Sequence, residues 1–313
     1  MQECSAKQMC PEMEWCPLFK RTLETEEVRS KNAYDVTEDV ERRRLAFQME
    51  MTREIDVRVL KSILSNTKGV QYILDIGCND GSWLLDRLTN IGKECYAVGV
   101  DINEEIISRA NENFPEMLTV CSDCEKEDFV EQIYKKIPYG TQFDVVVLSM
   151  VLLHVKEPMQ VLRNVRKLLK TDGVVYIRDM DDGLSVAYPD KDGVFARVRR
   201  ICNDVKYTGY RTNGREIYGL LQRTGYKDIK NIGINVDVTM STPDDYKFRE
   251  DIFTINFGFI PGDLALALQD DPLKYKEDYL WLKNTGYEAL NGMFHTAEFY
   301  YRMGLMGFTA RKI

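Results

Sequence analysis

The sequence predicts an α/β fold, in which a doubly wound, mostly parallel seven-stranded sheet carries helices on both faces. Between residues 70 and 183, five apolar strand-like segments alternate with helix-like segments, and a glycine turn follows the first strand. Because parallel strands need long crossovers, this alternation indicates a parallel sheet. The length of 313 residues and the 44% hydrophobic content suit one elaborated α/β domain or two modest ones.

The five strands are apolar and rich in β-branched residues, as is typical of buried strands. They are "VQYILDIG" (70–77), "CYAVGVDI" (95–102), "LTVCSD" (118–123), "FDVVVLSM" (143–150) and "VVYIRDMDDG" (174–183), which ends in an acidic turn. The helices between them are "SWLLDRLTNIG", "EEIISRANENF", "FVEQIYKKI" and "PMQVLRNVRKLLKTDG", the last of which Gly173 is expected to stop.

The remaining chain predicts a further helix (215–226), a sixth strand (227–240) and a last strand (298–313). Residues 1–68 are charged and helix-like, and residues 242–296 are aromatic-rich and favour helix. We therefore expect an N-terminal helical extension (1–68), a core (69–241), a helical insertion (242–296) and a final core strand (297–313). Since the extension and the insertion have no place in the sheet, we expect them to form a lid over a ligand site.

Composition excludes several function classes. The formal net charge of −8 disfavours a general grip on nucleic acid. No apolar stretch reaches the roughly 18–20 residues that span a bilayer, and the N-terminus lacks the basic start and apolar run of a signal peptide. We therefore expect a cytoplasmic protein with no membrane or nucleic-acid partner.

The eight cysteines do not predict a metal site. Cys121 and Cys124 form a C-x-x-C pair, but the second pair that structural zinc usually needs is missing. Cys4, Cys10 and Cys16 are evenly spaced in a leader that we expect to be loosely ordered. In a reducing compartment these cysteines are expected to be free thiols.

The glycine turn "DIGCNDG" after the first strand is the expected ligand site, because ligands bind at the carboxyl ends of parallel strands. Gly77 and Gly81 allow a close approach of the backbone to a ligand, and Asp101, 20 residues after Gly81, is placed to bind a ribose diol. A nicotinamide cofactor would explain these features, but the turn departs from G-x-G-x-x-G. Asp75 would also place a carboxylate where a pyrophosphate should lie, which favours a cationic ligand.

These segments together resemble the class I S-adenosylmethionine-dependent methyltransferases. "ILDIGCNDG" is similar to their first motif, with Asn79 in place of the middle glycine, and "GVDI", "CSDC" and "FDVVVLSMVLLHVKEP" resemble the next three. "VLRNVRKLLKTDGVVYIRD" resembles their late helix and fifth strand. The resemblance covers residues 70–183 and implies a Rossmann-like core whose last strand is antiparallel.

The resemblance also implies a role for each matching residue. The methionine moiety would lie against Asp75 and the loop Gly77, Cys78, Asn79 and Gly81. Asp101 would bind the ribose hydroxyls, and Ile102 would pack on adenine. Asp123 would accept from the adenine amino group beside Cys124. Ser149 and Met150 would line the site near the sulfonium.

The candidate catalytic residues lie after the fourth and fifth strands. Asp179, Asp181 and Asp182 in "RDMDDG" could bind a cationic or hydroxyl-rich acceptor, take a proton or hold a divalent metal, although a metal would want more oxygen ligands than the sequence places here. Asp179 is the best placed to take a proton, and the alternative is an ordinary acidic turn in which Arg178 neutralises one carboxylate. His154, expected in the following helix, is a further catalytic candidate; helix packing is the alternative.

The leading interpretation is an S-adenosylmethionine-dependent methyltransferase that methylates nitrogen or oxygen of a small molecule. A non-catalytic S-adenosylmethionine-binding protein, a nicotinamide oxidoreductase and a methyltransferase of protein or nucleic acid are the alternatives. In-line methyl transfer needs alignment above all, and a general base only if the acceptor must lose a proton.

Overall fold

The computed structural model describes residues 39–65, 67–205 and 209–313, which belong to two compact units. The sheet unit comprises Met49–Asp181, Thr212–Asn235 and Leu305–Ile313. The helical unit comprises the chain up to Gln48, Asp182–Arg211 and Val236–Gly304. The boundaries of these units differ from those expected from the sequence. Residues 49–64, expected in the N-terminal extension, belong to the sheet unit, and residues 182–211, expected in the core, belong to the helical unit.

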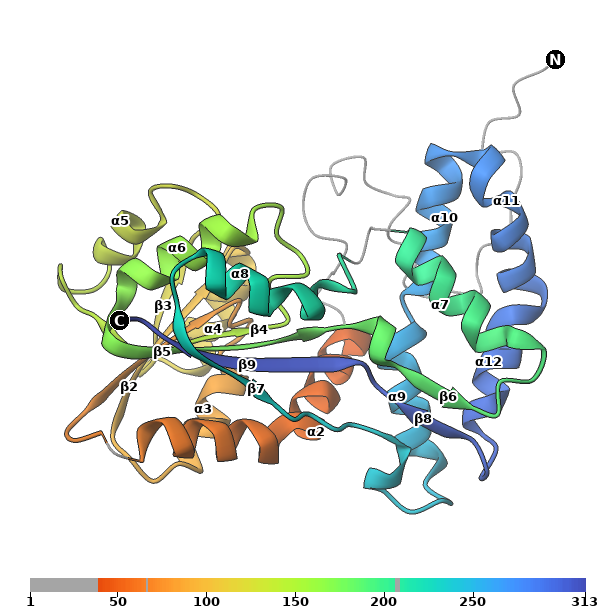
Figure 1. The fold of residues 1–313 in the computed structure, drawn as a ribbon, viewed down its shortest axis with the longest axis horizontal. Coiled ribbons are helices and arrows are strands. Elements are labelled where there is room, and N and C mark those ends of the chain that lie inside the picture. The colour runs from red at the N-terminus through yellow and green to blue at the C-terminus, as the bar shows by residue number, and fades with distance from the viewer. Residues whose placement is uncertain (1–38, 66, 206–208) are drawn as a thin grey trace. The chain divides into compact units, whose positions relative to one another are not determined.

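The sheet unit contains the predicted seven-stranded, mostly parallel sheet (Figure 1). The strand order is β3-β2-β1-β4-β5-β9-β7, with β9 antiparallel to both of its neighbours. The strands are β1 (Gln71–Ile76), β2 (Cys95–Asp101), β3 (Leu118–Cys121), β4 (Phe143–Ser149), β5 (Leu169–Met180), β7 (Lys227–Ile232) and β9 (Leu305–Arg311). The predicted fold class is therefore confirmed. All five parallel strands β1–β5 bring their carboxyl ends to one edge.

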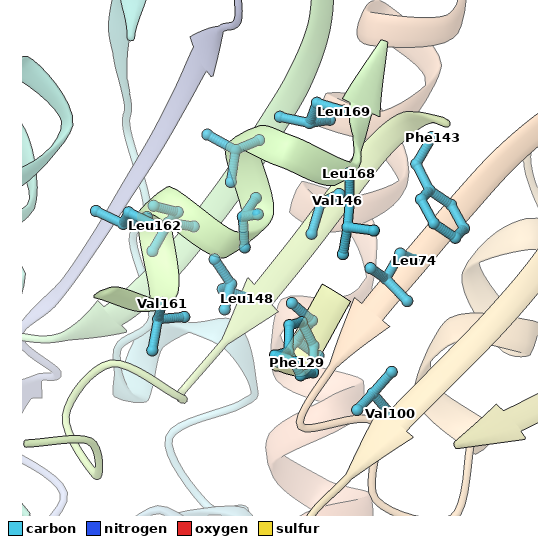
Figure 2. Close-up of a cluster of buried hydrophobic side chains, with 14 of the residues drawn as sticks. Leu74, Val100, Phe129, Phe143, Val146, Leu148, Val161, Leu162, Leu168 and Leu169 are labelled. Atoms are coloured by element: carbon cyan, nitrogen blue, oxygen red, sulfur yellow. The ribbon is translucent and has the colours of Figure 1, made fainter. Parts of the chain in front are cut away.

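Apolar side chains cover both faces of this sheet. Along β4, Val146 and Leu148 enter one core, and Val145 and Val147 enter the other, as alternation along a strand requires. The first core packs against α5 (Phe129–Tyr134), α6 (Pro158–Leu168) and α8 (Ile217–Arg223) (Figure 2). The second core packs against α2 (Asp39–Leu64, from Met49 in this unit), α3 (Ser82–Thr89) and α4 (Glu104–Asn113).

Several predicted boundaries are wrong. The helix expected at 158–173 ends at Leu168, because Leu169 is already extended (φ −72°, ψ 142°) and begins β5. Gly173 therefore lies within β5, where an added Cβ would come within 2.9 Å of the Lys170 carbonyl oxygen. The sixth strand ends at Ile232, and Val238–Met240 forms a 3₁₀ turn.

The segment expected to form one last strand is divided between the two units. β8 (Tyr300–Arg302) pairs with β6 (Val186–Tyr188), a strand that the sequence did not predict, and only β9 joins the large sheet. At the break, the Gly304 N–H donates to Ser185 Oγ at 3.0 Å.

The helical unit has an aromatic core, in agreement with the predicted helical insertion. Its helices include α7 (Val194–Asp204), α9 (Tyr246–Phe257), α10 (Ile260–Asp270), α11 (Pro272–Trp281) and α12 (Tyr287–Phe294). Phe257 contacts Phe294 and Tyr301 with ring centroids 5.9 and 5.7 Å apart. By length and composition Tyr246–Asp270 could cross a membrane, but 67% of its apolar window is buried inside the protein, as is usual for a core helix.

Phe129→Ala tests the core shown in Figure 2. The ring is fully buried, so its removal should lower the free energy of unfolding by about 3–5 kcal/mol in urea denaturation followed by circular dichroism. Tyr139, in the loop after α5, is 88% exposed, and Tyr139→Ala should cost less than about 1 kcal/mol. Equal losses in the two variants would contradict this description of the core.

Candidate functional site

The loop after β1 has the backbone that a close approach to a ligand requires. Gly77, Asn79 and Gly81 have φ angles of 73°, 49° and 82°, and asparagine is among the residues that tolerate this left-handed region best. A Cβ at Gly77 would lie 2.6 Å from a methyl group of the branched Val151 side chain, whereas one at Gly81 would meet the methyl group at the end of the flexible Met117 side chain. Gly77 is therefore required for packing as well as for conformation, and Gly81 is required for its positive φ.

Hydrogen bonds tie this loop to β2. The Gly77 and Cys78 N–H groups both donate to the Val100 carbonyl oxygen, at 2.7 and 2.9 Å. The Cys78 side chain is 2% exposed, and burial raises the pKa of its thiol well above the usual range. Cys78 is thus a packing residue of the loop.

Asp101 ends β2 and faces the same loop. Its two carboxylate oxygens accept from the Asn79 N–H (3.1 Å) and the Asn103 N–H (3.0 Å). Burial raises the pKa of this carboxyl, and the backbone hydrogen bonds act in the opposite direction. Each oxygen keeps a lone pair for a further donor, as a ribose diol would need.

The residues expected around adenine follow β2 and β3. Ile102 is 54% exposed, which leaves its side chain available for a flat ring. Asp123 Oδ1 accepts from the Glu125 N–H at 3.0 Å, and Asn164 Nδ2 holds the Cys124 carbonyl at 3.0 Å. Asp123 and Cys124 are both partly buried.

Asp75 is buried in a cluster of charged residues that the sequence analysis missed. Asp56 of α2 forms a fully buried ion pair with Arg87 of α3 at 3.1 Å. The same carboxylate accepts from Tyr176 Oη at 2.8 Å and lies 3.6 Å from Arg178 Nε. Burial raises the pKa of Asp75 well above its usual range, and the charges of Asp101 and Asp56 raise it further.

A sequence signal for Asp56 did exist. Asp56 lies three and four residues before Val59 and Leu60 on the apolar stripe of α2, and a carboxylate on such a stripe must find a buried partner. The choice of Arg87 as that partner depends on the packing of α2 against α3, which the sequence pattern does not specify.

Ser149 and Met150 occupy the end of β4 beside β5. Arg178 donates to Ser149 Oγ at 2.7 Å, and the Met150 N–H donates to the Arg178 carbonyl oxygen at 2.8 Å. Met150 has a φ of 60°, so the chain turns sharply where the expected site lies.

The acidic turn "RDMDDG" has partners other than those expected. Asp181 binds Arg215 with contacts of 2.5–3.2 Å, and Asp182 in the helical unit binds Arg211 at 2.6 and 3.0 Å. Arg178 therefore neutralises neither Asp181 nor Asp182, although its charge lowers the pKa of Asp179. Two of the three expected carboxylates are already paired with arginines.

Asp179 is fully buried and binds three donors. Its Oδ2 accepts from the Leu153 N–H (3.0 Å) and Asn213 Nδ2 (3.1 Å), and its Oδ1 accepts from the Met180 N–H (2.9 Å). Burial raises the pKa of Asp179 to about 7, although the hydrogen bonds oppose this shift. The carboxylate thus links the turn after β4 to the chain before α8.

Each unit contains one of the two histidines. His154 is exposed in the turn at 152–154, and the expectation that it lies in a helix is wrong because α6 begins only at Pro158. His295, in the helical unit, stacks on Tyr246 with ring centroids 6.2 Å apart. Cys4, Cys10 and Cys16 lie outside the described residues.

Comparison with known proteins agrees with this geometry. A family model described as a methyltransferase domain matches residues 41–231. An uncharacterised methyltransferase of Schizosaccharomyces pombe is 30% identical over 120 residues, 37% of this chain and 41% of the relative. A demethylmenaquinone methyltransferase of Listeria welshimeri is 26% identical over 102 residues, 32% of this chain and 41% of the relative. The chain thus matches about two fifths of the length of these relatives.

Two solved structures are similar to this chain at low sequence identity. The YcgJ protein of Bacillus subtilis is 14% identical, with a TM-score of 0.49 over 82% of this chain and 97% of that protein. The plantazolicin methyltransferase BpumL, solved in complex with SAH, is 15% identical, with a TM-score of 0.46 over 88% and 93% of the two chains. Because the family model matches more than half of its length, this chain belongs to the methyltransferase domain family of class I S-adenosylmethionine-dependent methyltransferases.

Proposed function

We propose that this protein transfers a methyl group from S-adenosylmethionine to a nitrogen or oxygen atom of a small molecule. The observation that carries the proposal is the arrangement of Asp75, the Gly77–Gly81 loop and Asp101 at the carboxyl edge of the sheet. A buried carboxylate suits a cationic donor, and the carboxylate of Asp101 suits a diol. S-adenosylmethionine has both features.

In this proposal the protein acts mainly by binding and alignment. S-adenosylmethionine supplies an activated methyl group on sulfur, and sulfur keeps the electron pair of the broken bond. Asp101 would hold the ribose, Ile102 and Asp123 the adenine, and the loop backbone the methionine moiety. The acceptor's own lone pair forms the new bond, and its proton leaves to a base or to water.

The acceptor class rests on the acidic character of the chain, whose formal net charge is −8, because arginines already pair Asp181 and Asp182 at the β5 edge. We propose an amine or hydroxyl compound of metabolite size, with the 242–296 insertion determining specificity. A cytoplasmic location and the absence of nucleic-acid and membrane partners stay predictions. A non-catalytic S-adenosylmethionine-binding protein is the alternative that a reaction assay addresses.

Incubation with methyl-labelled S-adenosylmethionine and a panel of amines and alcohols should give labelled small-molecule products. Asp101 is proposed to bind the donor. Asp101→Ala should therefore give less product when the donor concentration is limiting. Donor binding without any product across amines, alcohols, peptides and nucleic acids would favour the non-catalytic alternative.

Asp101→Ala should weaken binding of S-adenosylmethionine by about 1–3 kcal/mol, the range for hydrogen bonds to a charged group. Isothermal titration calorimetry measures this directly. Glu131→Ala, which removes an exposed carboxylate of α5, should leave the affinity unchanged. Unchanged affinity in Asp101→Ala, or micromolar binding of NAD, would rule out the assignment.

We propose that Asp179 positions the turn after β4, whereas the sequence favoured it as the proton acceptor. Its pKa is raised to about 7 in the folded protein, so the stability that its protonated form provides is lost as the pH rises from about 4 to about 7. Over this interval the wild type should lose stability relative to Asp179→Asn, measured by urea denaturation. If Asp179 is instead a general base, Asp179→Asn should lose turnover by about 100-fold or more with donor affinity unchanged.

A further inference from the structure

Five charged side chains lie together on the α2–α3 side of the sheet, near the proposed cofactor site. Asp75 shares its face of β1 with Ile73, and the next strands place Val147 and then Tyr176 in the same row. One pair further along, Ser149 lies beside Arg178. Asp56 of α2 lies over the row that contains Asp75 and Tyr176, and it accepts a hydrogen bond from Tyr176. Arg87 of α3 belongs to the same group of charged residues, because it pairs with Asp56.

The charges in this cluster do not balance. Asp56, Asp75 and Asp101 contribute three carboxylates, whereas Arg87 and Arg178 contribute two guanidinium groups. Arg53 and Asp86 form a separate, balanced pair at the rim, although Asp86 also contacts Arg87 at 2.9 Å. The neighbouring Cys78 thiol is neutral because burial raises its pKa.

Arg178 has donor capacity that its protein neighbours do not use. Its side chain is 3% exposed, yet Nε has no hydrogen-bond partner. Among the described residues, the one hydrogen bond of its guanidinium group goes to Ser149 Oγ, at the end of the strand where the sulfonium is expected. Because a guanidinium group only donates, its unused N–H groups point to a ligand with a hydrogen-bond acceptor at this edge, such as the carboxylate of the methionine moiety.

We propose that the cluster of Asp56, Asp75, Asp101, Arg87 and Arg178 is completed by the positive charge of S-adenosylmethionine, so that binding of the methyl donor displaces a proton from Asp75. This inference rests on the proposed function. Near neutral pH the donor carries a sulfonium and an ammonium group against one carboxylate, whereas the demethylated product has lost the sulfonium charge. The protein thereby distinguishes donor from product by charge.

The sign of the pH dependence follows from the charges. Without a ligand, protonation of Asp75 makes the net charge of the cluster zero. Burial and the charges of the Asp101 and Asp56 carboxylates favour this protonated form of Asp75. The donor binds the protein in which Asp75 is ionised. Its affinity therefore rises with pH, by up to about tenfold per unit below the pKa of the free site, and levels off above it. The affinity of the demethylated product changes less.

Calorimetric titrations of the wild type in phosphate and in Tris at equal pH measure the protons released on binding. We expect the donor to release a substantial fraction of a proton and S-adenosylhomocysteine to release at most half as much. Binding of the donor without proton release, or equal release by both ligands, would overturn the inference alone. Absence of binding by either ligand would overturn the proposed function as well.

Two matched substitutions assign the proton. Asp75→Asn should abolish the difference between donor and product, whereas Glu131→Gln, at an exposed position of α5, should retain it. Asp56→Asn removes one carboxylate and should move the rise in donor affinity to lower pH. Proton release that survives in Asp75→Asn would overturn the assignment, and the wild-type comparison decides the proposal even if a variant does not fold.

Discussion

The buried ion pair between Asp56 and Arg87 is the constraint on which the proposed site depends. Ionised groups are stable in a protein interior only with close partners, and removal of one partner usually costs several kcal/mol. This pair fixes α2 against α3, and Tyr176 connects it to the centre of the sheet. The surroundings of Asp75 are therefore set by a helix that precedes the first strand in the sequence.

The glycine loop meets a second requirement, because it allows the backbone to come close to a ligand without voids or clashes. Gly77 and Gly81 leave space that Val151 and Met117 fill, while two N–H groups bind one carbonyl of β2. Asp101 then accepts from the loop itself. In the proposed site, ribose recognition and loop conformation would be coupled, because the same carboxylate would serve both.

The fold could be predicted from the sequence because periodicity and order are local properties. Strand periodicity identified β1–β5, and the family motifs located the cofactor loop. Contacts between distant segments could not be predicted in this way: the partner of Asp56, the pairing of β6 with β8, and the start of β5 at Leu169. Each depends on which surfaces meet in three dimensions, and several amphipathic arrangements satisfy the same pattern.

The acidic turn shows why a cluster of like charges in a sequence is weak evidence for a ligand. From the sequence, Asp181 and Asp182 were expected to be free carboxylates. In the structure, Arg215 binds Asp181 and Arg211 binds Asp182, both with short contacts. Both arginines come from the segment that follows α7, some 30 residues later. In contrast, Asp75 is a single carboxylate within an apolar strand, where burial leaves its charge far more costly. The buried acid of the apolar strand, rather than the acidic turn, is thus the stronger indication of a cationic ligand.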